Sequence, residues 1–128
     1  MAKRENISSG AKWEDVVGYS RAVRVGDLIE ISGTVALKDG VLVGEGDAYL
    51  QTKRIIEIAK ETLSKAGARL EDVIRTRIYV TDISQWEAVG RAHGEIFASI
   101  KPATSMVEVS RLIDPGFLVE IEFTAMLQ

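Results

Sequence analysis

The chain has 128 residues, of which 46% are hydrophobic and 27% are charged, and its formal net charge at pH 7 is -3. These values are typical of one globular domain, 1–128, and the acidic balance argues against binding to nucleic-acid backbones. Having no cysteine and one histidine excludes disulfides and argues against zinc, so we expect neither a metal nor a cofactor. An apolar signal core and a membrane-length apolar run are both absent, which predicts a cytoplasmic protein without a membrane partner.

The N-terminal part of the chain predicts a lead-in followed by two strands. Residues 1–15 are mostly polar, and we expect them to form a loose N-terminal lead-in. Side chains alternate between two faces over residues 19–25 and again over residues 28–35. Gly26 and Asp27 lie between these segments and form a typical two-residue hairpin turn.

Two helices are predicted in the middle of the chain. Asp47 is a favourable N-cap and Gly67 a favourable stop, and apolar residues recur between them at helical spacing. A second helix is expected to begin with a capping box from Ser84 to Glu87 and to end before Pro102. Its buried stripe is predicted to contain Trp86, Val89, His93, Ile96, Phe97 and Ile100.

Three further strands complete the predicted fold. Residues 73–81 form the strand between the helices, with Ile74 and Ile78 on its apolar face. The stretch 102–122 contains two strands around a turn at Asp114-Pro115-Gly116. The predicted order is therefore β-β-α-β-α-β-β, an α+β domain with one sheet and two helices packed on one face.

The two strands of the stretch 102–122 each have an apolar and a polar face. In the first, Val107 is assigned to the apolar face, whereas Thr104 and Met106 fall on the other. In the second, Val119 is apolar and Glu120 polar. By the same parity, one polar face of the sheet gathers Glu30, Ser32, Arg75, Arg77, Tyr79, Glu108, Glu120 and Glu122.

Two interpretations of this polar face remain open. The face can be solvated, with ion pairs between neighbouring strands, as in many antiparallel sheets. Alternatively, assembly of several copies can enclose it, so that its glutamates and arginines neutralise one another where water is partly excluded. Closed symmetric oligomers are the usual way to enclose such a face.

These segments together resemble the reactive intermediate deaminase family (RidA, also called YjgF or endoribonuclease L-PSP) over nearly the whole chain. The resemblance rests on Gly18-Tyr19, Ile31-Ser32-Gly33, Ala66-Gly67, Asp72-Val73-Ile74, Tyr79-Val80-Thr81-Asp82, Pro102-Ala103 and Val107-Glu108-Val109. It implies a chorismate-mutase-like fold and a homotrimer that binds a small molecule in clefts between subunits. The best-known members of the family hydrolyse imines and enamines, such as 2-aminoacrylate, to a keto acid and ammonia.

The resemblance also implies roles for particular residues. Glu120 corresponds to the family glutamate that positions water, and Tyr19 to a cleft tyrosine. The family anchors the substrate carboxylate with the arginine of a Pro-Ala-Arg motif, and Thr104 occupies that position here. A hydroxyl cannot replace a guanidinium, which forms a bidentate pair with a carboxylate.

Other residues are candidates for binding the substrate. Arg21 shares strand parity with Tyr19 and can supply the missing charge, although the residue pattern favours a solvated residue of an edge strand. If the ligand is not a carboxylate, Met106 makes the pocket more apolar. Ser32 is a further candidate substrate-binding residue, whereas His93 is expected to have a hydrogen-bonded packing role in the second helix.

Three functions are compatible with these residues. The first is a deaminase, a hydrolase of a small imine, enamine or related reactive metabolite, in which Glu120 places water. The second is a trimer that binds a small metabolite without converting it. The third is a ribonuclease, which the acidic balance and the lack of a basic, aromatic surface favour least.

Overall fold

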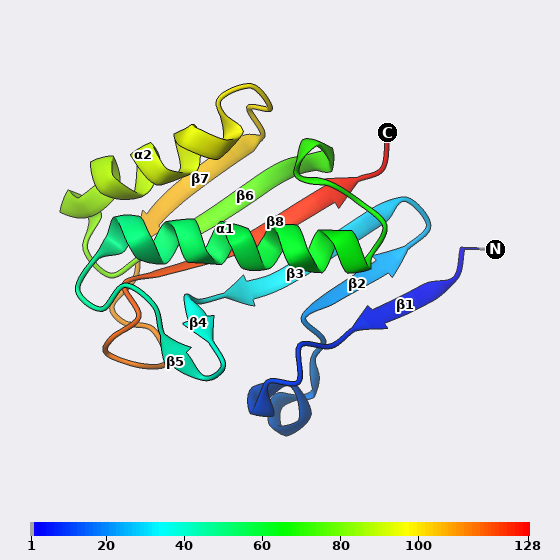
Figure 1. Cartoon of the computed structure of the whole chain (residues 1–128), viewed down its shortest axis with the longest axis horizontal. Coiled ribbons are helices and arrows are strands. Elements are labelled where there is room, and N and C mark those ends of the chain that lie inside the picture. The colour runs from blue at the N-terminus through cyan, green and yellow to red at the C-terminus, as the bar shows by residue number, and fades with distance from the viewer. Residues whose placement is uncertain (1) are drawn as a thin grey trace.

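The computed structural model describes residues 2–128 as one sheet with two long helices over it (Figure 1). The sheet contains β1 (Arg4–Ile7), β2 (Ala22–Val25), β3 (Leu28–Thr34), β6 (Val73–Val80), β7 (Ala103–Glu108) and β8 (Val119–Met126). The long helices are α1 (Ala48–Lys65) and α2 (Trp86–Phe97). Smaller elements are the turns η1 (Glu14–Gly18), η2 (Leu70–Asp72) and η3 (Ile83–Gln85), and the hairpin of β4 (Leu37–Lys38) and β5 (Val41–Leu42).

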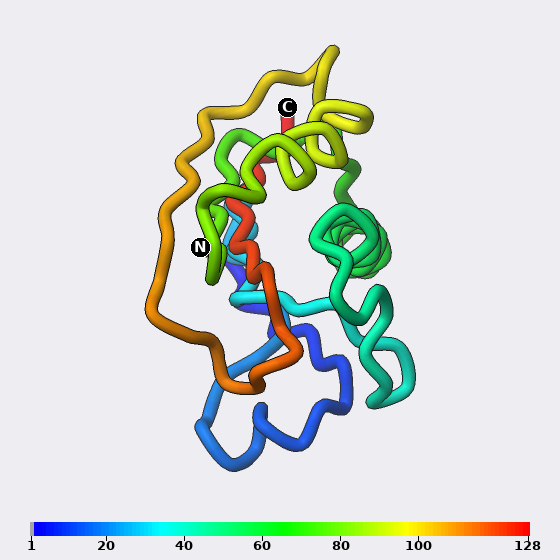
Figure 2. The backbone as a smooth tube through the Cα atoms, turned by 90° about the vertical axis from the view of Figure 1, so that its left-hand side faces the viewer, coloured from blue at the N-terminus to red at the C-terminus, as the bar shows by residue number. Residues whose placement is uncertain are grey.

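The strand order in the sheet is β1-β2-β3-β8-β6-β7, and only β6 and β7 run parallel. Figure 2 shows the sheet from its end, with both long helices on the same side. The predicted α+β fold, with one sheet and two helices on one face, is confirmed. The opposite side, which we call the open face, is covered by no helix of residues 2–128. None of the helices formed by residues 2–128 is long and apolar enough to cross a membrane.

Helix α1 begins and ends where the sequence predicts. The Asp47 carboxylate accepts a hydrogen bond from the backbone N–H of Leu50 at 3.0 Å, and Gly67 follows the last turn with a φ of 82°. From β2, the Arg24 guanidinium donates to the carbonyl of Ala66 at 2.6 Å, where the helix dipole favours a cation. The apolar stripe of the helix is buried against the sheet: Ala48, Thr52, Ile55, Ala59, Leu63.

The N-terminal residues are more ordered than the loose lead-in that we expected. Arg4–Ile7 form β1, which pairs antiparallel with β2 at the edge of the sheet. A four-residue segment with one apolar side chain has no visible alternation, so its strand conformation comes from pairing and not from its own pattern. The first predicted strand, residues 19–25, is longer than the observed β2, which begins at Ala22.

Two apolar side chains lie on the surface and not in the predicted core. Ile74 is 45% exposed, whereas Val73 is 2% exposed, because the pairing of β6 with β8 shifts register between Val73 and Arg75. Trp86 is 55% exposed at the first residue of α2. The predicted capping box is wrong, since the Ser84 hydroxyl donates to Asp82 at 2.6 Å and does not cap α2.

The face assignment of β7 is also wrong. The stretch 102–122 does form two strands, but β6 lies between β7 and β8. In the parallel ladder Thr104 lies beside Thr76 and Met106 beside Ile78, and both partners are buried under the helices. Thr104 and Met106 therefore point to the helix side, and Val107 points to the open face. An exposed edge strand has no buried side to reveal which of its alternating faces is inward.

Candidate functional site

The open face carries the polar cluster that strand parity predicts. In the ladder between β6 and β8, Arg77 lies opposite Glu122 and Tyr79 opposite Glu120. The Tyr79 hydroxyl donates to the Glu122 carboxylate at 3.1 Å, and Arg75 donates to the Ser105 hydroxyl at 2.8 Å. Within residues 2–128, the ion pairs are confined to the helices and join Lys53 and Arg54 to glutamates. The cross-strand ion pairs of the solvated interpretation are thus not formed.

Glu108 belongs to neither this cluster nor the open face. It ends β7 beside Val80, which is buried, and its carboxylate accepts a hydrogen bond from the backbone N–H of Ile83 at 3.0 Å. The carboxylate therefore holds the start of η3, and its predicted place on the polar face is wrong for the same reason as that of Thr104.

The carboxylate of Glu120 lies directly over the backbone of Gly33. A Cβ atom added to Gly33 would collide with this carboxylate, whose Cδ atom would be 2.9 Å away. Gly33 lies where the pairing of β3 with β8 is irregular, between Ile31 and Thr34. A glycine in a strand often marks such a close approach. The absence of a side chain at this position thus makes the space that Glu120 occupies.

Burial raises the pKa of the Glu120 carboxyl above its usual value, and the neighbouring Glu122 raises it further, whereas Arg21 opposes the shift. A carboxylate removed from water is harder to ionise, and a like charge nearby adds to this effect. Raised carboxyl pKa values are typical of groups that take part in proton transfer. Glu120 is therefore chemically suited to accept a proton from a bound water.

Arg21 is buried beside Glu120, with 8% of its surface exposed, and is not a solvated edge residue. Its guanidinium donates to the carbonyl of Gly33 and lies 5.7 Å from the centre of the Tyr19 ring. Burial lowers the pKa of Arg21, and Tyr19, Glu14 and Glu120 oppose that shift. The Nε of Arg21 has no hydrogen-bond partner within residues 2–128. A buried guanidinium N–H without a partner is costly to the fold.

A second carboxylate that interacts with Arg21, that of Glu14, is buried. Burial raises its pKa, but hydrogen bonds from Ser9 and Ser8 outweigh this effect and hold the pKa below the usual value. Glu14 is therefore ionised and neutralises part of the charge of Arg21. Glu14 was not predicted as a site residue, because it lies in the N-terminal segment that was expected to be loose.

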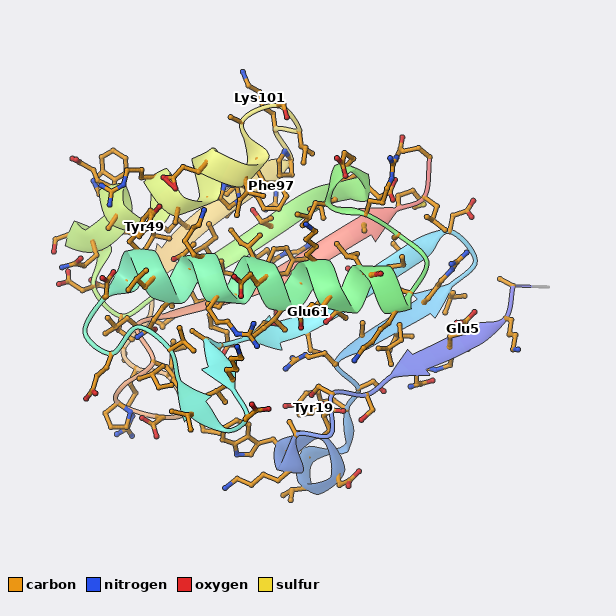
Figure 3. The ribbon with its side chains drawn as sticks, in the orientation of Figure 1. Glu5, Tyr19, Tyr49, Glu61, Phe97 and Lys101 are labelled. Atoms are coloured by element: carbon orange, nitrogen blue, oxygen red, sulfur yellow. The ribbon has the colours of Figure 1, made fainter. Side chains whose placement is uncertain are left out.

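Tyr19 and Ser32 lie beside an open depression at the N-terminal side of the sheet. Figure 3 shows Tyr19 next to η1, below the ends of the strands. The Ser32 hydroxyl donates to the carbonyl of Ser20 at 2.7 Å, so its proton is used in holding the chain before β2. The depression is lined by Arg4, Asn6, Glu14, Asp15, Gly18, Tyr19, Ser20, Val23 and Ser32.

Thr104 and Met106 lie apart from these residues, on the helix side of the sheet. Met106 packs against the core. The hydroxyl oxygens of Thr104 and Thr76 are 2.8 Å apart, and the Thr76 hydroxyl is 3.0 Å from Nε2 of His93. The structure thus brings Glu120, Arg21 and Tyr19 together, and it separates them from Thr104 and Met106 by the thickness of the sheet.

Comparison with known proteins identifies the family of the chain. Residues 9–127 match the family model described as Endoribonuclease L-PSP. The chain belongs to the RidA/YjgF/L-PSP family. Its fold is that of the family structures, which are chorismate-mutase-like, as the sequence resemblance implied.

Individual relatives cover almost the entire chain. It is 42% identical to an uncharacterised protein of Streptomyces coelicolor, over 93% of this chain and 89% of that protein. It is 38% identical to a RutC family protein of Pyrococcus abyssi, over 84% of each chain. The crystal structure of a YjgF/YER057c/UK114 family member from Mycobacterium tuberculosis superposes with a TM-score of 0.89 at 49% identity, covering 98% of this chain and 100% of that one.

The candidate site of this RidA/YjgF/L-PSP family member includes residues that the sequence showed only indirectly. Gly33 ends the Ile31-Ser32-Gly33 motif, but the motif does not show that a side chain at this position would collide with Glu120, which is distant in the sequence. Thr76 interrupts an apolar strand face, and that interruption was the one visible sign of its contact with His93. His93 itself has the predicted packing role, since its ring lies against Phe97 with 4.6 Å between the ring centres. Residues 2–128 contain no cluster of acidic, histidine or cysteine side chains suited to a metal.

Proposed function

We propose that this protein is a cytoplasmic RidA-like hydrolase of small imines, enamines or related reactive metabolites, and that it acts as a deaminase in clefts between the subunits of a homotrimer. Its substrate anchoring is atypical, because Thr104 replaces the family arginine. The observation that carries the proposal is the half-buried Glu120, held over Gly33 beside Arg21 with a raised pKa. Membership of the family supports the reaction class, whereas the fold alone does not specify it.

In the proposed reaction, Glu120 holds a water molecule against the imine carbon and accepts a proton as the water attacks. A positioned carboxylate contributes to catalysis both as a base and by fixing the geometry of attack. The resulting carbinolamine breaks down to a carbonyl product and ammonia. Arg21 contributes a buried positive charge beside Glu120, which attracts an anionic substrate group in place of the missing arginine.

The placement of Thr104 supports a cleft made by two copies of the chain. The family resemblance puts the residues equivalent to Thr104 and Glu120 at one ligand, yet here they lie on opposite faces of one sheet. Two copies packed side by side can bring the Thr104 edge of one to the open face of the next. The exposed apolar side chains of Val107, Leu28 and Met126 on the open face also favour burial by a partner.

The assembly is tested by measuring molar mass with light scattering. We expect three copies at micromolar concentration, and Val107→Glu on the open face should weaken this assembly. Val41→Glu is the matched control, because Val41 is the same residue type and is even more exposed, but lies in the small hairpin outside the main sheet. A stable monomer in the wild type contradicts the proposed clefts.

The reaction is tested with 2-aminoacrylate generated in a coupled assay. Glu120→Gln should lower kcat by about 10²-fold, the usual scale for losing a general base. Glu30→Gln is the matched control, since Glu30 is a carboxylate of the same face that hydrogen-bonds Thr124 and lies away from Arg21. Equal turnover in wild type and Glu120→Gln removes Glu120 from the mechanism.

The alternative function is a trimer that binds a small metabolite without converting it. The replacement of an anchoring guanidinium by the Thr104 hydroxyl favours this alternative, because an uncharged group holds a carboxylate less firmly. Binding of a stable keto acid to a wild type that shows no turnover would support it. The ribonuclease that the family description names is disfavoured by the net charge of -3 and by the carboxylates of the open face.

A further inference from the structure

Thr104, Thr76 and His93 form a hydrogen-bonded chain of three side chains from the edge of the sheet into the interior. Thr104 is exposed on the edge strand β7, whereas Thr76 on β6 is fully buried. Their hydroxyl oxygens are 2.8 Å apart, and the Thr76 hydroxyl is 3.0 Å from Nε2 of His93 on α2. Both distances are those of hydrogen bonds. This chain lies on the helix side of the sheet and is separate from the Glu120 cluster.

The number of protons in this hydrogen-bonded chain links the protonation of Nε2 of His93 to the direction of the two hydrogen bonds. A threonine hydroxyl has one proton to donate, and a neutral imidazole carries a proton on only one nitrogen. If Thr76 donates its one proton to Nε2 of His93, then Thr104 must be the donor in the hydrogen bond between Thr104 and Thr76. If Nε2 carries a proton, Thr76 accepts that proton's hydrogen bond and donates to Thr104. Thr104 is then free to donate outward, and its nearest acceptor is the carbonyl of Pro102 at 3.2 Å.

The surroundings of His93 leave Thr76 as its described polar partner. The ring lies against Phe97, and burial lowers the pKa of His93. Where α2 meets α1, the charged groups Lys53, Glu95 and Arg91 interact with one another and with Tyr49. On β6, Arg75 and Arg77 point to the open face, away from His93. A buried imidazolium without a carboxylate partner is a stronger acid than one in water.

We propose that Thr104, Thr76 and His93 form a proton relay whose outer end, the Thr104 hydroxyl, donates a proton to an enamine ligand. Thr104 is the catalytic residue, because it contacts the ligand, and Thr76 and His93 act through it as positioning residues. This inference rests on the proposed function.

The proposed step balances in protons and electrons. The electron pair of the enamine C=C bond forms a new C–H bond with the proton of Thr104, which leaves an iminium carbon. Thr104 takes the proton of Thr76, and Thr76 takes the Nε2 proton of the His93 imidazolium. His93 ends neutral and regains, through the solvent, the proton that Glu120 takes from the attacking water. The iminium ion is the species that the Glu120-bound water then attacks in the proposed hydrolysis.

The hydrogen-bonded chain can be tested without any turnover. The sequence has one histidine, so nitrogen NMR of the ring reports the tautomer of His93 without overlap. We expect Thr104→Val, two hydrogen bonds away, to shift the tautomer balance of His93, and Thr76→Val to shift it more. Thr52→Val is the matched control, because Thr52 is equally buried but donates within α1 to Ala48. Identical ring signals in wild type and Thr104→Val overturn the relay.

The catalytic role is tested by turnover of 2-aminoacrylate. Thr76→Val should lower kcat at least about tenfold with little change in KM, since losing a proton donor affects the transition state. Thr76→Ser keeps the hydroxyl and should rescue kcat. Equal kcat in Thr76→Val and Thr52→Val, in an active enzyme, overturns the relay while the proposed function stands. A wild type that does not turn over 2-aminoacrylate overturns both the proposed function and the proton delivery by Thr104. The NMR result then decides only whether the three side chains are linked by hydrogen bonds.

Discussion

The carboxylate of Glu120 on β8 occupies the space that a side chain on residue 33 would fill. This relationship joins β3 and β8 through two residues, 33 and 120, that are 87 positions apart in the sequence. It places a hard-to-ionise carboxylate on the open face within reach of Arg21. The candidate site therefore depends on a residue that has no side chain.

Gly33→Ala should destabilise the protein, because the added methyl group collides with the Glu120 carboxylate. Overpacking of this kind costs about 1–3 kcal/mol in the free energy of unfolding. Denaturant unfolding measures the cost. The double variant Gly33→Ala/Glu120→Ala should recover most of it, since neighbouring residues couple. A matched control is Gly94→Ala in α2, where an added Cβ meets nothing within 4 Å. Additive effects in the double variant would show that the collision is relieved elsewhere.

Arg21→Met should raise the pKa of Glu120 further, because the guanidinium opposes the upward shift that burial and Glu122 cause. Carbon NMR of the labelled glutamate carboxyls across a pH series measures this change. The substitution also leaves the carbonyl of Gly33 without its donor, which costs about 1–3 kcal/mol where the group is buried. Arg111→Met, at an exposed position after β7, serves as the control. A pKa of Glu120 that is unchanged or lower in Arg21→Met contradicts the described electrostatics.

The stability of the fold should decrease as the pH falls through 6.5, the ordinary pKa of histidine, because burial lowers the pKa of His93 in the folded state. In that range the unfolded chain takes up a proton that the folded chain does not, so acid favours unfolding. The loss should continue until the pH falls below the folded pKa. The raised pKa of Glu120 has the opposite sign, since its contribution to stability is lost as the pH rises through its folded pKa.

Denaturant unfolding of wild type and His93→Gln at several pH values separates the two effects, because the variant keeps Glu120. The difference in unfolding free energy between the two proteins should shrink as the pH falls through this range. A difference that is independent of pH would show that His93 has the same pKa in the folded and unfolded states.

Trp86→Ala and Phe97→Ala should differ strongly in cost, although both residues belong to α2 and both were predicted to be buried. Phe97 is 2% exposed, and its truncation should cost about 3–5 kcal/mol in the free energy of unfolding. Trp86 lies mostly in solvent, and its truncation should cost less than about 1 kcal/mol. Thermal and denaturant unfolding compare them directly. A large cost for Trp86→Ala in dilute monomer would place it in the core, whereas a cost seen only in the assembled protein would place it at a subunit contact.

The sequence by itself determined the elements whose side-chain pattern is strong. Helix α1 has both a capping residue and a long apolar stripe, so its ends and its buried face were predictable. Alternation in β8 likewise placed Glu120 opposite the core, because a strand buried on one side must follow a period of two. The motifs shared with the family indicated the fold and named Glu120 and Tyr19 as site residues.

Only the tertiary structure decided which strands are neighbours and which side of each faces the core. A register shift turned Ile74 outward, and pairing with β6 turned Thr104 toward His93. The burial of Arg21 near Glu14 and Glu120 likewise depends on segments that meet only in the folded chain. The physical reason is that pairing, register and burial of charge are set by contacts between residues far apart in the sequence, whereas a local pattern of side chains fixes only the period of an element.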